Sequence, residues 1–235
     1  MTPPAGDAVI EACGEQAIIV RFGTAIDPAL NARAHALAAG VRRAAPAWLV
    51  DCTPSYAAVL IAFDALAIAA ADVQAFVRER LADVAGAEPA ERPWVEVPVC
   101  YAPALAPDLI DVAEACRLTV EDVVRRHSER IYRVYALGFR PGFPFMGGVD
   151  EAIAVPRLAT PRARVDAGAV GIAGRQTGIY PSAGPGGWRL IGRTPWRLFD
   201  PSASAPFRLA AGDNVRFVPI DVGEFQRLSE RPRAD

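Results

Sequence analysis

The sequence predicts an α+β protein in two domains, a ferredoxin-like α/β domain over residues 1–90 and a β-barrel over residues 91–225. Helical and strand-like periodicities alternate in the first part, whereas short apolar runs separated by glycine and proline dominate the second. The polar, proline-containing residues 87–93 lie between these two patterns and are the expected domain boundary. Residues 226–235 are expected to form a polar tail.

Two helices and a small sheet account for the first domain. Asp27, followed by Pro28, is expected to begin a helix that ends before Pro46, because apolar residues recur on one helical face between them. Asp72 is expected to cap a second helix that ends near Gly86. Strand-like apolar runs lie at residues 17–20, 48–52 and 57–63. Two helices on one face of such a sheet would give the ferredoxin-like arrangement.

The second domain begins with a strand-like alternation at residues 94–99 and continues with two short helices at about 108–116 and 120–127. The acidic character of these helices argues against a DNA-binding role for them, so we expect no nucleic acid partner. From residue 131 onward the pattern is that of many short strands. Closure of such strands into a barrel removes exposed edges, which makes a closed barrel the expected architecture.

The composition is that of a globular protein with one unusual feature. Among 235 residues, 52% are hydrophobic and 22% charged, and the net charge is −2. All 25 basic residues are arginine. The absence of lysine excludes a Walker-type phosphate loop, a Schiff-base mechanism and a biotin attachment site on this chain.

Cysteine and histidine are too sparse for a metal site. The four cysteines contain no CxxC pair and the chain has two histidines, so we expect reduced thiols and no metal. The N-terminus lacks the pattern of a secretory signal. The longest apolar stretch, residues 56–71, is too short to span a membrane. These features predict a cytoplasmic protein with no membrane partner.

Glycine and arginine are concentrated in one part of the chain. Residues 135–200 contain twelve of the nineteen glycines, and eight arginines against four acidic residues. Glycine lets another group approach the backbone closely, and a local excess of four positive charges favours an anionic ligand or an acidic partner. A small anionic substrate is therefore the first hypothesis for this surface.

The same region carries long motifs that resemble the 5-oxoprolinase B-subunit family, also known as allophanate hydrolase subunit 1 or Kip-inhibitor-like. The motifs are ALGFRPGFPFMG (136–147), ATPRARV (159–165), GIAGRQTGIYP (171–181), PGGW (185–188) and IGRTP (191–195). The resemblance extends from about Gly14 to Ile220 and implies a C-terminal cyclophilin-like β-barrel after a small α/β domain.

The resemblance also implies a function. Members of the family act as the B-subunit of an ATP-dependent 5-oxoprolinase, which opens the lactam of 5-oxo-L-proline to give L-glutamate. The implied partners are a C-subunit of the AHS2 type and an A-subunit of the LamB/YcsF type. ATP would be used by the complex, because lactam hydrolysis is uphill near neutral pH, and any biotin would have to be on another chain.

Arg140 and His127 are the candidate catalytic residues. Arg140 lies in the most distinctive motif, where it could hold a carboxylate or phosphate, or instead form an ion pair with a partner subunit. His127 shares a helical face with apolar residues, so it is either a core histidine or a general base.

Four further residues are candidates for substrate binding. Arg162 and Arg164 are two positions apart and would point to one face of a strand, as a double cation or as a solvated strand face. Gln176 and Tyr180 could orient a lactam or a ribose, or could stabilise a turn.

An aromatic group in the same motifs is the candidate partner interface. It consists of Phe139, Phe143, Phe145 and Trp188, although Trp188 could instead belong to the barrel core or stack on a ligand. These residues also support the alternative function, which the family resemblance implies for some members: a protein-binding inhibitor of a sensor histidine kinase that does no chemistry.

Overall fold

The computed structural model describes residues 8–89 and 94–230. The chain divides into two compact units, Met1–Glu91 and Arg92–Asp235. Each unit has its own apolar core. The division falls within the stretch expected to be the domain boundary, and the predicted α+β class with a closed barrel is confirmed.

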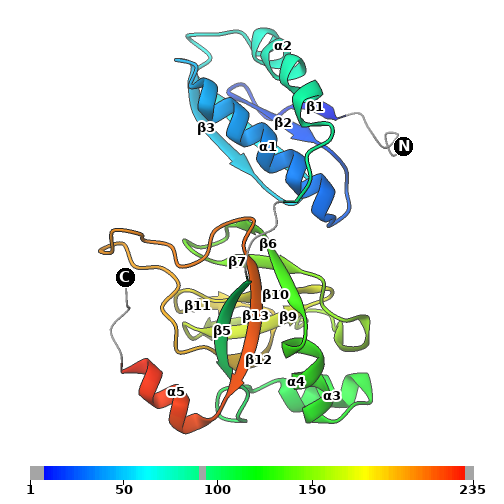
Figure 1. Cartoon of the computed structure of the whole chain (residues 1–235), viewed down its shortest axis with the longest axis vertical. Helices are drawn as coiled ribbons and strands as arrows, with labels where there is room; N and C mark the ends of the chain where they lie inside the picture. The colour runs from blue at the N-terminus through cyan, green and yellow to red at the C-terminus, as the bar shows by residue number, and fades with distance from the viewer. Residues whose placement is uncertain (1–7, 90–93, 231–235) are drawn as a thin grey trace. The chain divides into compact units, whose positions relative to one another are not determined.

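The first unit is a four-stranded antiparallel sheet with two helices (Figure 1). The strand order is β1-β2-β4-β3. Helix α1 packs on β3 and β4, and α2 packs on β2. The elements are β1 (Val9–Ala12), β2 (Ala17–Arg21), α1 (Pro28–Ala44), β3 (Leu49–Pro54), β4 (Ala58–Phe63), α2 (Ala70–Leu81) and the short 3-10 helix η1 (Ala82–Val84).

The predicted ferredoxin-like arrangement of the first unit is not confirmed, because its strands follow one another in a different order along the chain. The sequence pattern predicts one strand in this part of the chain, at residues 17–20, whereas the structure has a hairpin, β1–β2, that turns at Gly14. In a split βαββαβ unit, the edge strand that pairs with the first strand comes last. Here that edge position is occupied by β1, from the start of the chain.

The ends of the two helices test the capping predictions. The Asp27 carboxylate accepts hydrogen bonds from the backbone N–H groups of Ala29 and Leu30, at 2.8 and 3.0 Å, so the predicted cap of α1 is confirmed. The predicted cap at Asp72 is wrong. Helix α2 begins at Ala70, after Ala69, and Asp72 lies in its first turn. Alanine is the strongest helix former, so residues before the aspartate extend the helix.

The second unit is built on a closed seven-stranded barrel in the order β10-β7-β6-β13-β5-β12-β9. Strands β13 and β5 pair in parallel, and the other neighbours are antiparallel. The barrel strands are β5 (Trp94–Cys100), β6 (Ile131–Leu137), β7 (Pro144–Gly147), β9 (Ala169–Ala173), β10 (Gln176–Ile179), β12 (Arg189–Arg193) and β13 (Asn214–Ile220). A separate ribbon pairs β8 (Arg162–Val165) with β11 (Gly184–Gly186).

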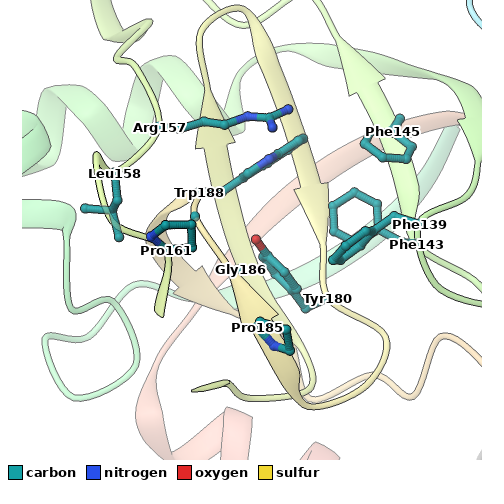
Figure 2. Close-up of a pocket in the computed structure, with 11 residues that line it drawn as sticks. Phe139, Phe143, Phe145, Arg157, Leu158, Pro161, Tyr180, Pro185, Gly186 and Trp188 are labelled. Carbon is teal, nitrogen blue, oxygen red and sulfur yellow. The ribbon is translucent and has the colours of Figure 1, made fainter. Parts of the chain in front are cut away.

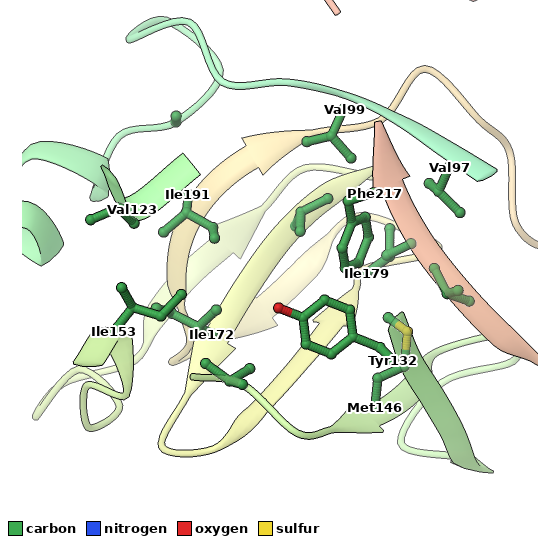
Figure 3. Close-up of a cluster of buried hydrophobic side chains, with 14 of the residues drawn as sticks. Val97, Val99, Val123, Tyr132, Met146, Ile153, Ile172, Ile179, Ile191 and Phe217 are labelled. Carbon is green, nitrogen blue, oxygen red and sulfur yellow. The ribbon is translucent and has the colours of Figure 1, made fainter. Parts of the chain in front are cut away.

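Helices α3 (Leu109–Cys116), α4 (Val120–Ser128) and α5 (Val222–Ser229) and the 3-10 helix η2 (Glu151–Ile153) complete the unit. The Thr119 hydroxyl caps α4 by accepting from the Asp122 N–H. Helix α5 includes residues 226–229, so the first residues of the predicted polar tail are helical. Residues 231–235 lie outside the described residues. The barrel interior is filled by side chains, and Figure 3 shows Tyr132 and Phe217 among them, with ring centroids 5.5 Å apart.

Three chemical features of the described residues bear on function. The four cysteines are free thiols. Within residues 8–89 and 94–230, no group of three or more His, Cys, Asp or Glu side chains could hold a metal ion. No helix in these ranges is long and apolar enough to cross a membrane.

Candidate functional site

The second unit contains an aromatic pocket of about 300 Å³ (Figure 2). Its walls come from the β6–β7 turn and β7, from the loop before β8, from the end of β10, and from the segment around β11. The lining residues are Phe139, Phe143, Phe145, Arg157, Leu158, Pro161, Tyr180, Pro185, Gly186, Gly187 and Trp188. The volume is at the lower end of the range of small-molecule sites.

The four aromatic residues predicted as a partner interface all line this pocket. Phe143 is at the centre of the group, with its ring centroid 5.6 Å from Phe139, 4.7 Å from Phe145 and 5.4 Å from Trp188. The contacts with Phe139 and Trp188 are edge-to-face and the contact with Phe145 is tilted, and such contacts stabilise an aromatic cluster. Phe143 and Trp188 are buried, whereas Phe139 is 63% exposed. These four residues therefore form the inner wall of a pocket and do not form a patch that projects from the surface.

The β6–β7 turn holds Phe139 in a strained conformation. Its φ of 62° is uncommon for a bulky residue, and the Arg140 N–H donates to the Gly138 carbonyl at 2.6 Å, as in a γ-turn. A second turn follows at once, because the Phe143 N–H donates to the Arg140 carbonyl at 3.0 Å around Gly142, whose φ is 83°. Backbone strain of this kind is often found at functional sites.

Tyr180 supplies a buried hydroxyl to the pocket. The residue is 1% exposed, and a Cβ at Gly186 would lie 2.5 Å from its hydroxyl oxygen, so only glycine leaves room for it there. Burial raises the pKa of the Tyr180 phenol above its ordinary value. A backbone hydrogen bond with Trp188 lowers this pKa, and so do the positive charges of Arg157, Arg140 and Arg162. The phenol is neutral at pH 7 and can donate a hydrogen bond.

Arg140 joins two loops and does not line the pocket. Its guanidinium donates to the Ala183 carbonyl at 2.6 Å and to the Ser182 hydroxyl at 3.4 Å. A side chain at Gly184 would collide with this guanidinium. Two of the glycines that suggested close approach by a ligand, Gly184 and Gly186, thus make room for the chain's own side chains.

Arg162 and Arg164 both have acidic partners within the chain. Arg162 donates twice to the buried Asp108, at 2.6 and 3.0 Å. The Asp108 carboxylate also accepts from the Leu190 N–H at 2.6 Å. Arg164 is exposed and lies 3.4 Å from Asp166. Neither arginine lines the pocket, nor does Gln176 on β10, so the structure brings only Tyr180 of the four predicted substrate-binding residues into it.

His127 lies in the barrel core. It is 0% exposed, and its ring stacks on Phe217 with centroids 4.5 Å apart. Nδ1 is 2.9 Å from the Tyr101 hydroxyl, and Nε2 is 2.9 Å from the Thr177 hydroxyl, which also donates to the Gly171 carbonyl. Burial lowers the pKa of His127 to about 3. Of the two alternatives open from the sequence, this environment fits a core histidine, and His127 does not line the pocket.

Arg157 is a pocket residue that the sequence did not single out. It is exposed, lines the pocket, and has its guanidinium carbon 5.7 Å from the centre of the Trp188 ring. Six of the eight arginines in residues 135–200 pair with a carboxylate. Within the part of the chain that the structure describes, the exceptions are Arg140 and Arg157. The excess of arginine was the signal that could have found Arg157, but only the fold shows which arginines remain without an acid.

The fold and the site define a class of protein: an α+β chain with a closed β-barrel and, beside it, a small aromatic pocket with uncompensated positive charge. The chain belongs to the family described as carboxyltransferase domain, subdomain C and D, whose model matches residues 8–209. Curated relatives confirm the resemblance to the 5-oxoprolinase B-subunit that the motifs indicated.

Two of these relatives are named as the B-subunit of 5-oxoprolinase. One, from Bacillus subtilis (strain 168), is 40% identical over 231 residues, which are 94% of this chain and 96% of the relative. Another, from Escherichia coli O157:H7, is 52% identical over 136 residues, 58% of this chain and 62% of the relative.

Solved structures agree on the fold. TTHA0988 has a TM-score of 0.79 at 38% identity, and the match covers 88% of this chain but 40% of that longer chain. The Kluyveromyces lactis urea amidolyase gives a TM-score of 0.75 at 20% identity, covering 97% of this chain and 16% of the enzyme, which supports the fold alone.

Proposed function

We propose that this chain is the B-subunit of an ATP-dependent 5-oxoprolinase, active in the cytoplasm with a C-subunit and an A-subunit as partners. The observation that carries the proposal is the Bacillus subtilis relative of that name, which matches almost end to end. The complex would hydrolyse the lactam of 5-oxo-L-proline to L-glutamate. ATP would supply the driving force by phosphorylating the amide oxygen.

Two observations support a role as a non-autonomous component. The same chain matches nearly the whole of one relative and 40% of the longer TTHA0988 chain, as expected of a module that works beside another module. The residues lining the pocket include no carboxylate, histidine, cysteine or serine. A nucleophile or general base would therefore have to come from outside this pocket, and under the proposal a partner subunit supplies it.

The charge around the pocket suits the proposed chemistry. Opening an activated lactam develops negative charge on oxygen, and positively charged groups fixed nearby stabilise such charge. Arg157 and Arg140 both act on the Tyr180 hydroxyl and have no acidic partner among the described residues. Their guanidinium groups could bind carboxylate or phosphate oxygens in pairs.

The kinase-inhibitor alternative would use the same aromatic residues as a docking patch. Of these residues only Phe139 is strongly exposed, and Phe143 and Trp188 are already buried within the unit. Interfaces depend on aromatic anchors that become buried on binding. The geometry of the pocket therefore favours the enzyme component.

The proposal is tested by reconstitution. We expect the purified chain alone to release no glutamate from 5-oxoproline, and we expect ATP-dependent release when both partner proteins are added. Each pairwise mixture serves as a control. Glutamate release by the single chain, or no release by the complete mixture, would contradict the proposal.

A further inference from the structure

We propose that the aromatic pocket is the binding site for the lactam ring and carboxylate of 5-oxoproline, with Arg157 as the carboxylate-binding residue and Tyr180 as the donor to the lactam oxygen. The identity of the ligand depends on the proposed function, whereas the pocket and its polar groups come from the structure. Of the residues that the sequence indicates for substrate binding, only Tyr180 lines this pocket.

The size and lining of the pocket fit a single small ring. Its volume is about 300 Å³, and its walls are almost entirely aromatic, proline and glycine residues. Such a lining is suited to the methylene face of a saturated ring, since small-molecule sites are mostly apolar with a few polar groups that fix orientation. Phe143 and Trp188, whose ring planes are nearly perpendicular at 88°, form two of these walls.

Two polar groups of the pocket have unused hydrogen-bonding capacity. Arg157 has no acidic partner within residues 94–230, and its exposed guanidinium presents several N–H donors. The buried Tyr180 hydroxyl accepts from the Trp188 backbone, and no described residue accepts its own hydrogen. Because Tyr180 lines the pocket, this hydrogen can be donated to a ligand oxygen bound there.

The two groups are related through Trp188, which contacts both. The Arg157 guanidinium carbon lies 5.7 Å from the centre of the Trp188 ring, and the Trp188 backbone forms a hydrogen bond with the Tyr180 hydroxyl. Figure 2 shows the indole between the two groups. A ring lying along Trp188 would thus have a cationic group near one end and a neutral donor near the other, which matches the carboxylate and the carbonyl of a lactam acid.

The other arginines considered for substrate binding do not line the pocket, and Arg140 donates to the Ala183 carbonyl and the Ser182 hydroxyl. Arg162 is held by Asp108, and Arg164 is paired with Asp166. Arg164→Ala is therefore a matched control for Arg157→Ala, because both remove one exposed arginine and only Arg157 lines the pocket.

The proposal is tested by measuring how three ligands bind to the full chain and to three single-residue variants of it. The ligands are 5-oxo-L-proline, 2-pyrrolidinone, which lacks the carboxylate, and cyclopentanecarboxylate, which lacks the lactam. Each is titrated by calorimetry or by NMR.

We expect Arg157→Ala to weaken binding of 5-oxoproline at least about tenfold and to leave binding of 2-pyrrolidinone unchanged. Tyr180→Phe should weaken both lactams and spare cyclopentanecarboxylate, and Arg164→Ala should change nothing. Equal effects of Arg157→Ala on 5-oxoproline and 2-pyrrolidinone, or no binding of 5-oxoproline by the wild-type chain, would overturn the proposal.

The reconstituted complex separates this inference from the proposed function. We expect Arg157→Ala to raise KM for 5-oxoproline at least about tenfold while the Arg164→Ala complex keeps the wild-type KM. A complex that turns over 5-oxoproline with the same KM after Arg157→Ala overturns the inference and leaves the proposed function intact. A wild-type complex with no turnover overturns the proposed function, and binding by the single chain would then still support the pocket as a lactam-acid site.

Discussion

Arg162 and Arg164 are two positions apart on β8, yet they are in different environments. Asp108 is 2% exposed, and its carboxylate accepts two hydrogen bonds from Arg162 and one from the Leu190 N–H. A buried carboxylate that loses its cation is strongly destabilised. Arg164 has a side chain that is 75% exposed, where an ion pair contributes little.

This difference predicts the stability of two variants. We expect Arg162→Ala to lower the free energy of unfolding by about 3 kcal/mol, because it leaves Asp108 buried without its cation. Arg164→Ala should change it by less than about 0.5 kcal/mol. Urea denaturation of both variants measures the difference. Similar losses in the two variants would show that the Asp108 pair does not have a structural role.

At this scale the sequence could predict the residue types of the site but not their partners. The count of arginines indicated positive charge, and the motif strings placed the four aromatic residues that do line one pocket. Asp108 and Arg162 are 54 residues apart, so nothing local in the chain relates them. Which arginine remains uncompensated depends on such distant pairings, and Arg157 could be recognised only after them.

His127 connects three elements of the barrel unit. It lies on α4, and its ring nitrogens contact Tyr101, just after β5, and Thr177 on β10. The Thr177 hydroxyl donates to the Gly171 carbonyl, so it accepts from His127, and Nε2 carries the proton. Nδ1 is then the acceptor from the Tyr101 hydroxyl. This chain of hydrogen bonds satisfies a neutral ring and leaves no place for a second proton.

The stability of the protein should therefore decrease in acid. Burial lowers the pKa of His127 to about 3 in the folded state, against an ordinary value of 6.5. Between these values the unfolded chain binds the proton and the folded chain does not. We expect this residue to contribute a loss of about 1.4 kcal/mol per pH unit as the pH falls below 6.5, ending near pH 3.

NMR titration of the imidazole measures this directly. The His127 ring signals should stay those of a neutral Nε2–H tautomer down to about pH 4, and the slope of stability against pH should be reduced in His127→Gln. A ring that titrates near its ordinary pKa of 6.5 would contradict the buried hydrogen-bond chain.

Local signals predicted the longer elements well and the shortest ones poorly. The helices α1 and α4 begin at recognisable caps, Asp27 and Thr119, and their apolar faces are periodic. The strand β11 is Gly184–Gly186, the sequence Gly-Pro-Gly, which has no alternation and is a strand only because it pairs with β8. The strand β1, four residues long, was missed for a similar reason: its position at the sheet edge comes from tertiary pairing with β2.

At the scale of the whole molecule, the chain has two separate cores. The core of the first unit is drawn only from residues in the range 8–84, and the barrel core and the pocket cluster only from the range 94–217. The polar, proline-containing stretch 87–93 is the sequence feature nearest to this division. The sequence could not show that a pocket forms in the second unit, since its lining residues come from four separate segments.

This organisation predicts that residues 94–230 fold without the first unit. Each core buries its own apolar residues, and burial of apolar surface is the main favourable contribution to folding. We expect the fragment to give an amide NMR spectrum that superimposes on the corresponding signals of the full chain. The full chain should unfold in two transitions, the later one matching the fragment, because the barrel unit has the larger core and a larger unit buries a greater fraction of its surface. A fragment without dispersed signals, or a full chain whose two cores lose their signals in one coincident transition, would show that the units stabilise each other.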